Sequence, residues 1–238
     1  MPLSISVTTR ALATRCRASA LATGGTAPYV YSVVAGGAGG TINSSTGFYT
    51  APNALGTDTI RVTDATTATA DITIMVGTPL QLLAEVIRNQ MSLTDDQVYL
   101  WDQKINIPTD SRLYVAVSSS TPKPFGNSSV INSAGMELQS PNFQALVGID
   151  ILSRSNEALL RKEEVILALG SIYSQQQQQI NSFYIAKQSV GFVNISEIDG
   201  QAIPYRYNIL ISIQYMVQQS RAGSYFDNFA TPQVVVEA

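Results

Sequence analysis

The sequence predicts a mostly β protein in two parts, an all-β sandwich followed by an α+β domain. Residues 1–78 are rich in Thr, Ala, Gly and Ser and contain short alternating segments between turn residues. Helical spacing first appears after Pro79, and the longer second part then mixes strand-like and helix-like segments. That order is typical of an antiparallel sheet with a helix packed on one face.

Alternation with a period of two residues runs through the first part. In "LSISVTT", Leu3, Ile5 and Val7 share one face, and "DTIRVTD" (58–64) and "ADITIMV" (70–76) repeat the pattern. Gly24 and Gly25 supply a turn between segments. Turn signals at intervals of roughly ten residues favour a sandwich.

The segment "GGTAPYVYSVVAGGAGGTINSSTGFYTAPNALGTDTIRVTD" (24–64) resembles bacterial immunoglobulin-like domains of cell-surface and bacteriophage structural proteins. The resemblance covers residues 3–77 and implies an immunoglobulin-like β-sandwich over 1–78 that acts as a spacer or adhesive module. Within it, Thr46-Gly47 suits a tight turn, and we expect Phe48 and Tyr49 to point to opposite faces.

The second part opens with helix signals. Pro79 suits the first turn of an amphipathic helix over 79–92, and a second short helix over 93–103 would be capped by Thr94. Asp95 and Asp96 then lie near its positive end, which favours capping over a metal site. A strand is expected at 111–120, a loop at 121–135 and a longer strand at 142–155.

One long helix is predicted over 155–183, with Ser155 as its cap. Charged residues 161–164 mark the solvent face, and Gln175–Gln179 form its polar end. Its apolar stripe consists of Leu159, Ile166, Leu169 and Tyr173. Strands over 183–196 and 203–220 follow, and residues 207, 209, 211, 213 and 215 of the last one share a face.

The order of strand 142–155, the helix, the strand "YRYNILISIQY" and an apolar C-terminal arm resembles ring-forming neck proteins of tailed bacteriophages, the tail-terminator and collar group. The likeness spans about residues 98–230. It implies a ring-forming domain over 79–221 and an arm over 222–238. The implied partners are other copies of the chain and neighbouring portal, connector, tail tube or sheath proteins, with DNA passing through the lumen without specific binding.

The arm is the predicted interface. Its candidate contact residues are Phe226, Phe229, Val234, Val235 and Val236. Three consecutive valines have a strong β preference and are too apolar to be left in water. Gly223 and Pro232 allow the chain to leave its own domain, so we expect the arm to add to a neighbour's sheet edge.

Composition argues against an enzyme. The chain has no histidine, a single cysteine (Cys16) and no phosphate-loop motif, so we expect no catalytic residues, no cofactor and no metal. Calcium at Asp58, Asp64 or Asp71 would be the most plausible exception, because it needs only oxygen ligands. Only 13% of residues are charged, which suits a protein packed against other proteins.

Two functions follow from these features. The first is a virion structural protein that forms a ring at the head–tail junction and is made in the host cytoplasm. The second is an adhesin or binding module that uses the sandwich for surface attachment. The start "MPLSISVTTR" lacks a signal-peptide pattern, and no apolar run approaches a membrane span, which favours the first. Residues 79–238 hold 14 acidic and 10 basic side chains, as a lumen that repels DNA would need.

Overall fold

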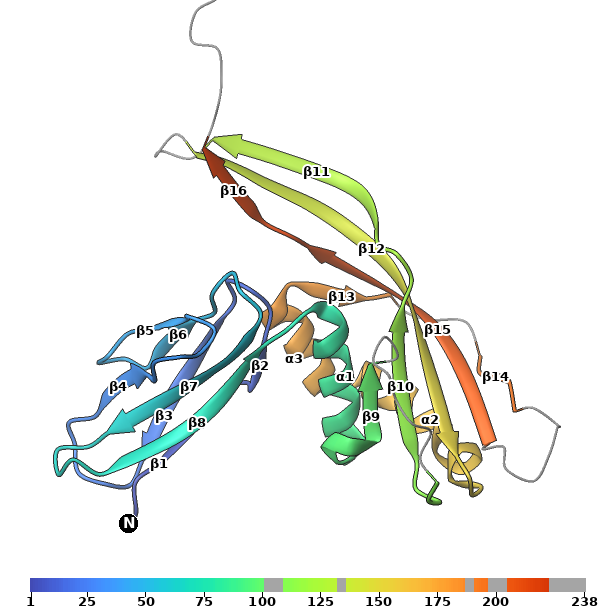
Figure 1. Ribbon diagram of the computed structural model, residues 1–238, viewed down its shortest axis with the longest axis horizontal. Helices are drawn as coiled ribbons and strands as arrows, with labels where there is room; N and C mark the ends of the chain where they lie inside the picture. Colours follow the sequence, from blue (N-terminus) through green and yellow to red (C-terminus); the bar gives the residue numbers. More distant parts are fainter. Residues whose placement is uncertain (101–108, 132–135, 187–190, 197–204, 223–238) are drawn as a thin grey trace, which may run out of the picture.

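The computed structural model describes residues 1–100, 109–131, 136–186, 191–196 and 205–222. Strands make up 45% of the structure, and the described residues include three α-helices. Figure 1 shows a β-sandwich, a larger sheet with helices against it, and an arm of strands that projects from this sheet. The prediction of a β-rich fold with some helix is therefore confirmed.

The sandwich consists of two four-stranded sheets, ordered β1-β3-β6-β5 and β2-β8-β7-β4. Its pairs are antiparallel, apart from the parallel pair β2–β8. Alternate residues of β7 and β8 are buried in a core shared by both sheets. The strands are β1 (Ser4–Val7), β2 (Ala11–Leu12), β3 (Arg17–Thr23), β4 (Val30–Val33), β5 (Thr41–Ile42), β6 (Phe48–Thr50), β7 (Gly56–Thr63) and β8 (Thr69–Val76).

A buried carboxylate anchors one end of this core. Tyr49 is fully buried while Phe48 is 56% exposed, so the two rings face opposite sides as predicted. The Tyr49 hydroxyl donates to Asp58 Oδ2 at 2.5 Å, and the Gly39 and Gly40 amides donate to the same carboxylate. Burial alone would raise the pKa of Asp58, but these hydrogen bonds outweigh it and hold the pKa below its ordinary value.

The second domain is built on one eight-stranded sheet with the central order β13-β15-β12-β10-β9. β11 and β16 pair with β12, β14 pairs with β15, and only β9–β10 is parallel. Its elements are α1 (Pro79–Gln90), the 3-10 turn η1 (Asp95–Gln97), β9 (Val98–Leu100), β10 (Tyr114–Ser119), β11 (Lys123–Ile131), β12 (Met136–Ser153), α2 (Glu157–Gly170), α3 (Ile172–Asn181), β13 (Phe183–Ile185), β14 (Val193–Asn194), β15 (Tyr205–Met216) and β16 (Gln219–Ala222).

The helices cover one face of this sheet. Val147, Ile149 and Ile151 of β12 point into a core that also contains buried residues of α1 and α2. On the opposite face, Leu146 and Leu210 are about half exposed. The residues of the last strand predicted to share a face do so, and this face points inward, since Tyr207, Ile209, Ile211 and Ile213 are all buried.

Several predicted elements differ from the structure. The expected loop over 121–135 contains β11, because β12 extends far enough to give it a partner and Pro124 lies on an edge strand beside a bulge, where proline is tolerated. The predicted helix over 93–103 is only the turn η1, followed by β9; residues 101–103 lie outside the described ranges. The strand expected over 183–196 is two short strands, β13 and β14.

The long helix predicted over 155–183 is broken at Ser171. This residue is extended (φ −64°, ψ 158°), ends α2 and begins α3, and its Oγ accepts a hydrogen bond from the Ser174 amide. Asn156 occupies the N-cap position of α2 but makes no side-chain capping hydrogen bond, whereas the predicted Ser155 accepts one from the Glu157 amide at 3.3 Å. The predicted stripe is correct only in part, because Leu169 is buried but Leu159 and Ile166 are exposed. The other residues that α2 buries are Ala158, Val165 and Ala168.

The break at Ser171 aims α3 at the sandwich (Figure 1). Gln177 and Asn181, each 4% exposed, form a polar bridge between the domains. Thr9 donates to Gln177 Oε1 at 2.9 Å, and the Ala13 amide donates to Asn181 Oδ1 at 2.7 Å. The glutamine run is therefore not simply a polar helix end, since one of its members is buried at the junction.

We expect Asn181→Ala to destabilise the protein, because it leaves the Ala13 amide without its acceptor at a buried site. Such a loss costs about 1–3 kcal/mol in the free energy of unfolding. Denaturant unfolding of the variant measures it. The exposed Gln179 of the same helix provides the matched control, Gln179→Ala. Equal stability of the two variants would contradict a structural role for the bridge.

Candidate assembly surfaces

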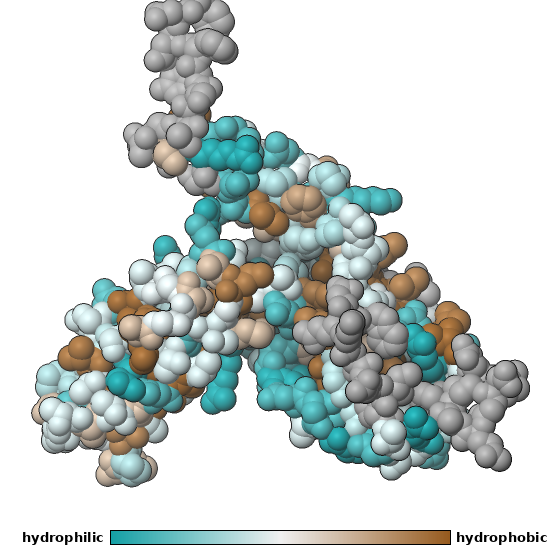
Figure 2. Space-filling model, viewed as in Figure 1, coloured by the Kyte–Doolittle hydropathy of each residue, from teal (hydrophilic) through white to brown (hydrophobic). Residues whose placement is uncertain are grey.

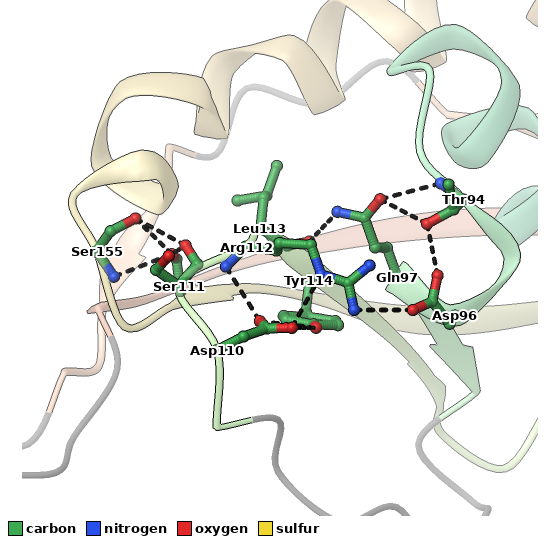
Figure 3. Close-up of polar contacts among 10 residues, drawn as sticks. Thr94, Asp96, Gln97, Asp110, Ser111, Arg112, Leu113, Tyr114 and Ser155 are labelled. Atoms are coloured by element: carbon green, nitrogen blue, oxygen red, sulfur yellow. Dashed lines mark hydrogen bonds and ion pairs between the residues drawn. The ribbon is translucent and has the colours of Figure 1, made fainter.

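A cluster of polar side chains gathers where β10 begins (Figure 3). Arg112 Nη2 lies 2.8 Å from Asp96 Oδ2, and Arg112 Nε lies 2.9 Å from Asp110 Oδ2. The Tyr114 hydroxyl also donates to Asp110, and Gln97 Nε2 donates to the Leu113 carbonyl at 2.8 Å. These contacts tie η1 to the start of β10.

The electrostatics of this cluster are those of a structural clamp. The hydrogen bond from Tyr114, followed by those from Arg112, holds the pKa of Asp110 below its ordinary value, and hydrogen bonds from Thr94 and Arg112 do the same for Asp96. Burial, and then Asp110, raises the pKa of Tyr114 to about 12. Carboxylates held in this way are poor proton acceptors near neutral pH, so the cluster suits positioning rather than acid–base chemistry.

The three aspartates considered for calcium are engaged elsewhere. Asp58 accepts from Tyr49, Asp64 accepts from the amides of residues 26, 66 and 68, and Asp71 pairs with Arg61. Across the described ranges, no three acidic, histidine or cysteine side chains gather as a metal site. Cys16 packs half-buried against the sandwich core, where burial raises its thiol pKa.

The arm formed by β11, the first half of β12, and β16 projects from the helix-covered part of the sheet (Figure 1). None of residues 123–131 or 136–139 is buried. Phe125, Val130 and Ile131 are 53–61% exposed, although a lone strand layer without a packed face is only marginally stable in water. The arm therefore offers both an unpaired strand edge and apolar side chains to another molecule.

A second apolar surface lies on α2, which we call the outer face of α2. Its residues are at helical spacing and point away from the core of the sheet domain. The members are Leu159, Leu160, Ile166, Leu167 and, after the break, Ile172, exposed by 42%, 67%, 46%, 72% and 75% respectively. Figure 2 shows hydrophobic surface in brown on the sandwich, the arm and the sheet domain, between polar regions.

The sequence contained a signal for this face that the single-stripe interpretation missed. The segment "EALLRKEEVILALG" is apolar at residues 158, 165, 168 and 169 and again at 159, 160, 166 and 167. A helix with two apolar stripes buries more than one face, against its own domain and against something else. The predicted interface residues Phe226, Phe229 and Val234–Val236 lie outside the described residues; β16 ends just before them, at the far end of the arm.

Comparison with known proteins does not identify the chain. No known protein family matches the chain, and no curated protein is significantly similar to it. Within the described part of the chain, no helix is long and apolar enough to cross a membrane. The exposed apolar surfaces are therefore the features that indicate a function.

Acid should weaken the clamp at the start of β10. Both carboxylates have a pKa below the ordinary value of about 3.9, so their stabilising contribution is complete above that value and is lost as the pH falls through the lower pKa of the folded state. We expect the Asp96→Asn, Asp110→Asn double variant to be less stable than wild type at pH 6. Its stability should also fall less steeply below pH 4 in urea titrations. If the stabilities of the double variant and the wild type changed in parallel with pH, this assignment of the two carboxylates would be contradicted.

Proposed function

We propose that this chain is a virion structural protein that assembles into a ring at the head–tail junction of a tailed bacteriophage, as a collar or tail terminator. The observation that carries the proposal is the pair of separate apolar surfaces, the arm and the outer face of α2. Two different surfaces on one protomer produce head-to-tail contacts, and such contacts close into a ring when the rotation between copies allows it.

Other features support the same function. The resemblance of residues 3–77 to immunoglobulin-like domains of phage structural proteins is compatible with a two-sheet sandwich that shares one core. The polar bridge at Gln177 and Asn181 joins this sandwich to the sheet domain. A sandwich carried at a fixed position on each subunit of a ring requires such a connection. The role is assembly rather than catalysis. The neighbours are portal, connector, tail tube or sheath proteins, and the acidic balance of residues 79–238 lets DNA pass without being gripped.

One observation favours the alternative, an adhesin or binding module. Phe48 and Leu21 are 56% and 62% exposed on the sandwich, and they are diagonal neighbours because Phe48 pairs with Ser19. An exposed aromatic–aliphatic pair on a flat sheet could contact a surface ligand. The pair is smaller than the outer face of α2, which an adhesin module would have no reason to expose.

The mass in solution tests the ring directly. We expect light scattering after size-exclusion chromatography to give an integral multiple of 25.6 kDa, and negative-stain images to show closed rings with a central opening. The mass should stay constant over a tenfold range of concentration, because a closed ring leaves no free surface for growth. A monomer at every concentration, with binding to bacterial surfaces, would instead establish the adhesin alternative.

A further inference from the structure

The outer face of α2 needs a partner that the described part of the chain does not supply. Leu160, Leu167 two turns further along α2, and Ile172 just after the break are each at least 67% exposed. Burying such side chains is favourable by about 25 cal/mol per Å² of apolar area. The only exposed carboxylate among them, Glu163, is paired with Lys162, so the face as a whole is suited to an apolar segment with few charges.

The C-terminal segment, residues 223–238, has this character. It contains Phe226, Phe229 and Val234–Val236, and its only charged side chains are Asp227 and Glu237. It leaves the described structure at Ala222, where β16 pairs with Met136 at the end of the arm. β16 thus ends at the far end of the arm, away from the helices of its own copy (Figure 1).

The length of the chain favours a second copy as the source of the segment. Ala222 lies opposite the first residue of the 18-residue strand β12, and α2 begins shortly after the last, Ser153. Along β12 these two ends are separated by at most about 58 Å, at about 3.4 Å per residue. Val235 follows Ala222 by 13 positions and reaches at most about 47 Å from it. The valines of one chain would therefore have to run back along β12 almost fully extended to approach Leu160 of the same chain, whereas the segment of a second copy is under no such constraint.

We propose that residues 223–238 of a second copy cover the outer face of α2. This inference rests on the proposed ring, in which every copy gives its C-terminal segment to one neighbour and receives the segment of the other. The acceptor is a helix face, which differs from the sheet edge expected from the sequence. The outer face of α2 and the apolar C-terminal segment of the second copy are then buried against each other.

Cysteine cross-linking between full-length chains tests the contact. In a Cys16→Ser background, a chain with Leu160→Cys is mixed with a chain carrying Val235→Cys, dissociated, reassembled and mildly oxidised. We expect a disulfide-linked dimer of the two chains in at least tenfold excess over the control pair, Leu21→Cys with Val235→Cys. Leu21 is 62% exposed on the sandwich, which matches the 67% of Leu160. Leu167→Cys provides a second acceptor position should Leu160→Cys fold poorly.

Light scattering of the same samples separates the two proposals. Rings that cross-link no more than the control pair would overturn the assignment of the segment to α2 and leave the ring proposal intact. A monomeric protein that forms only an internal disulfide, when both cysteines are on one chain, would overturn both. Reversible loss of the rings on deleting residues 223–238, with an unchanged circular dichroism spectrum, is the further result expected.

Discussion

The architecture depends on the length of β12. This strand of 18 residues pairs with β10, β11, β15 and β16, but the helices cover only its second half. From Ala145 onward its inward side chains enter the core, whereas residues 136–139 are only partly buried. Because one continuous strand serves both regions, the arm keeps the register of the core sheet while lacking a packed face of its own.

The base of the arm marks this change. Phe143 and Tyr215, from β12 and β15, stack with ring centroids 5.9 Å apart. Beyond this pair, β15 gives way to β16 across residues 217–218, and β16 follows β12 to the end of the arm. The first half of β12 thus gains hydrogen bonds from its neighbours without gaining a core. An element with paired strands but no packed face is suited to packing against another copy.

The break at Ser171 has a comparable effect on the helices. A straight helix over 155–183 would have continued along the sheet, whereas the extended backbone at Ser171 redirects α3 toward β2. Gln177 and Asn181 then reach backbone and side-chain groups of the sandwich. The same change of direction leaves Ile172 exposed, beside the outer face of α2. One local conformation therefore links the placement of the sandwich with the apolar surface.

The sequence was informative where local pattern decides structure. Alternation predicted β7, β8 and the residues of β15 that share a face, and Pro79 marked the start of α1, where the structure adds a capping box between Thr78 and Gln81. Prediction from the sequence failed where a partner distant in the chain determines the secondary structure. β11 is a strand because β12 extends beside it, and nothing local in a segment with two prolines indicates this.

The candidate surfaces were predictable only in part. The doubled apolar pattern of α2 was present in the sequence, but which stripe faces the core depends on how the helix packs on β12 and β15. The buried role of Gln177 was hidden within a run of identical residues, because only the direction of α3 brings one of them to Thr9. The interface residues predicted at the C-terminus stay a prediction.

Hydrogen–deuterium exchange tests the central claim, that the first part of β12 is completed by a neighbouring copy and the second part by its own core. In ring fractions, amides of residues 136–140 and 142 should be protected nearly as well as those of 145–151. In dissociated monomer, we expect the first set to exchange at least a hundredfold faster while the second set keeps its protection. Equal protection of both sets in the monomer would show that the arm is stable alone and would contradict the account.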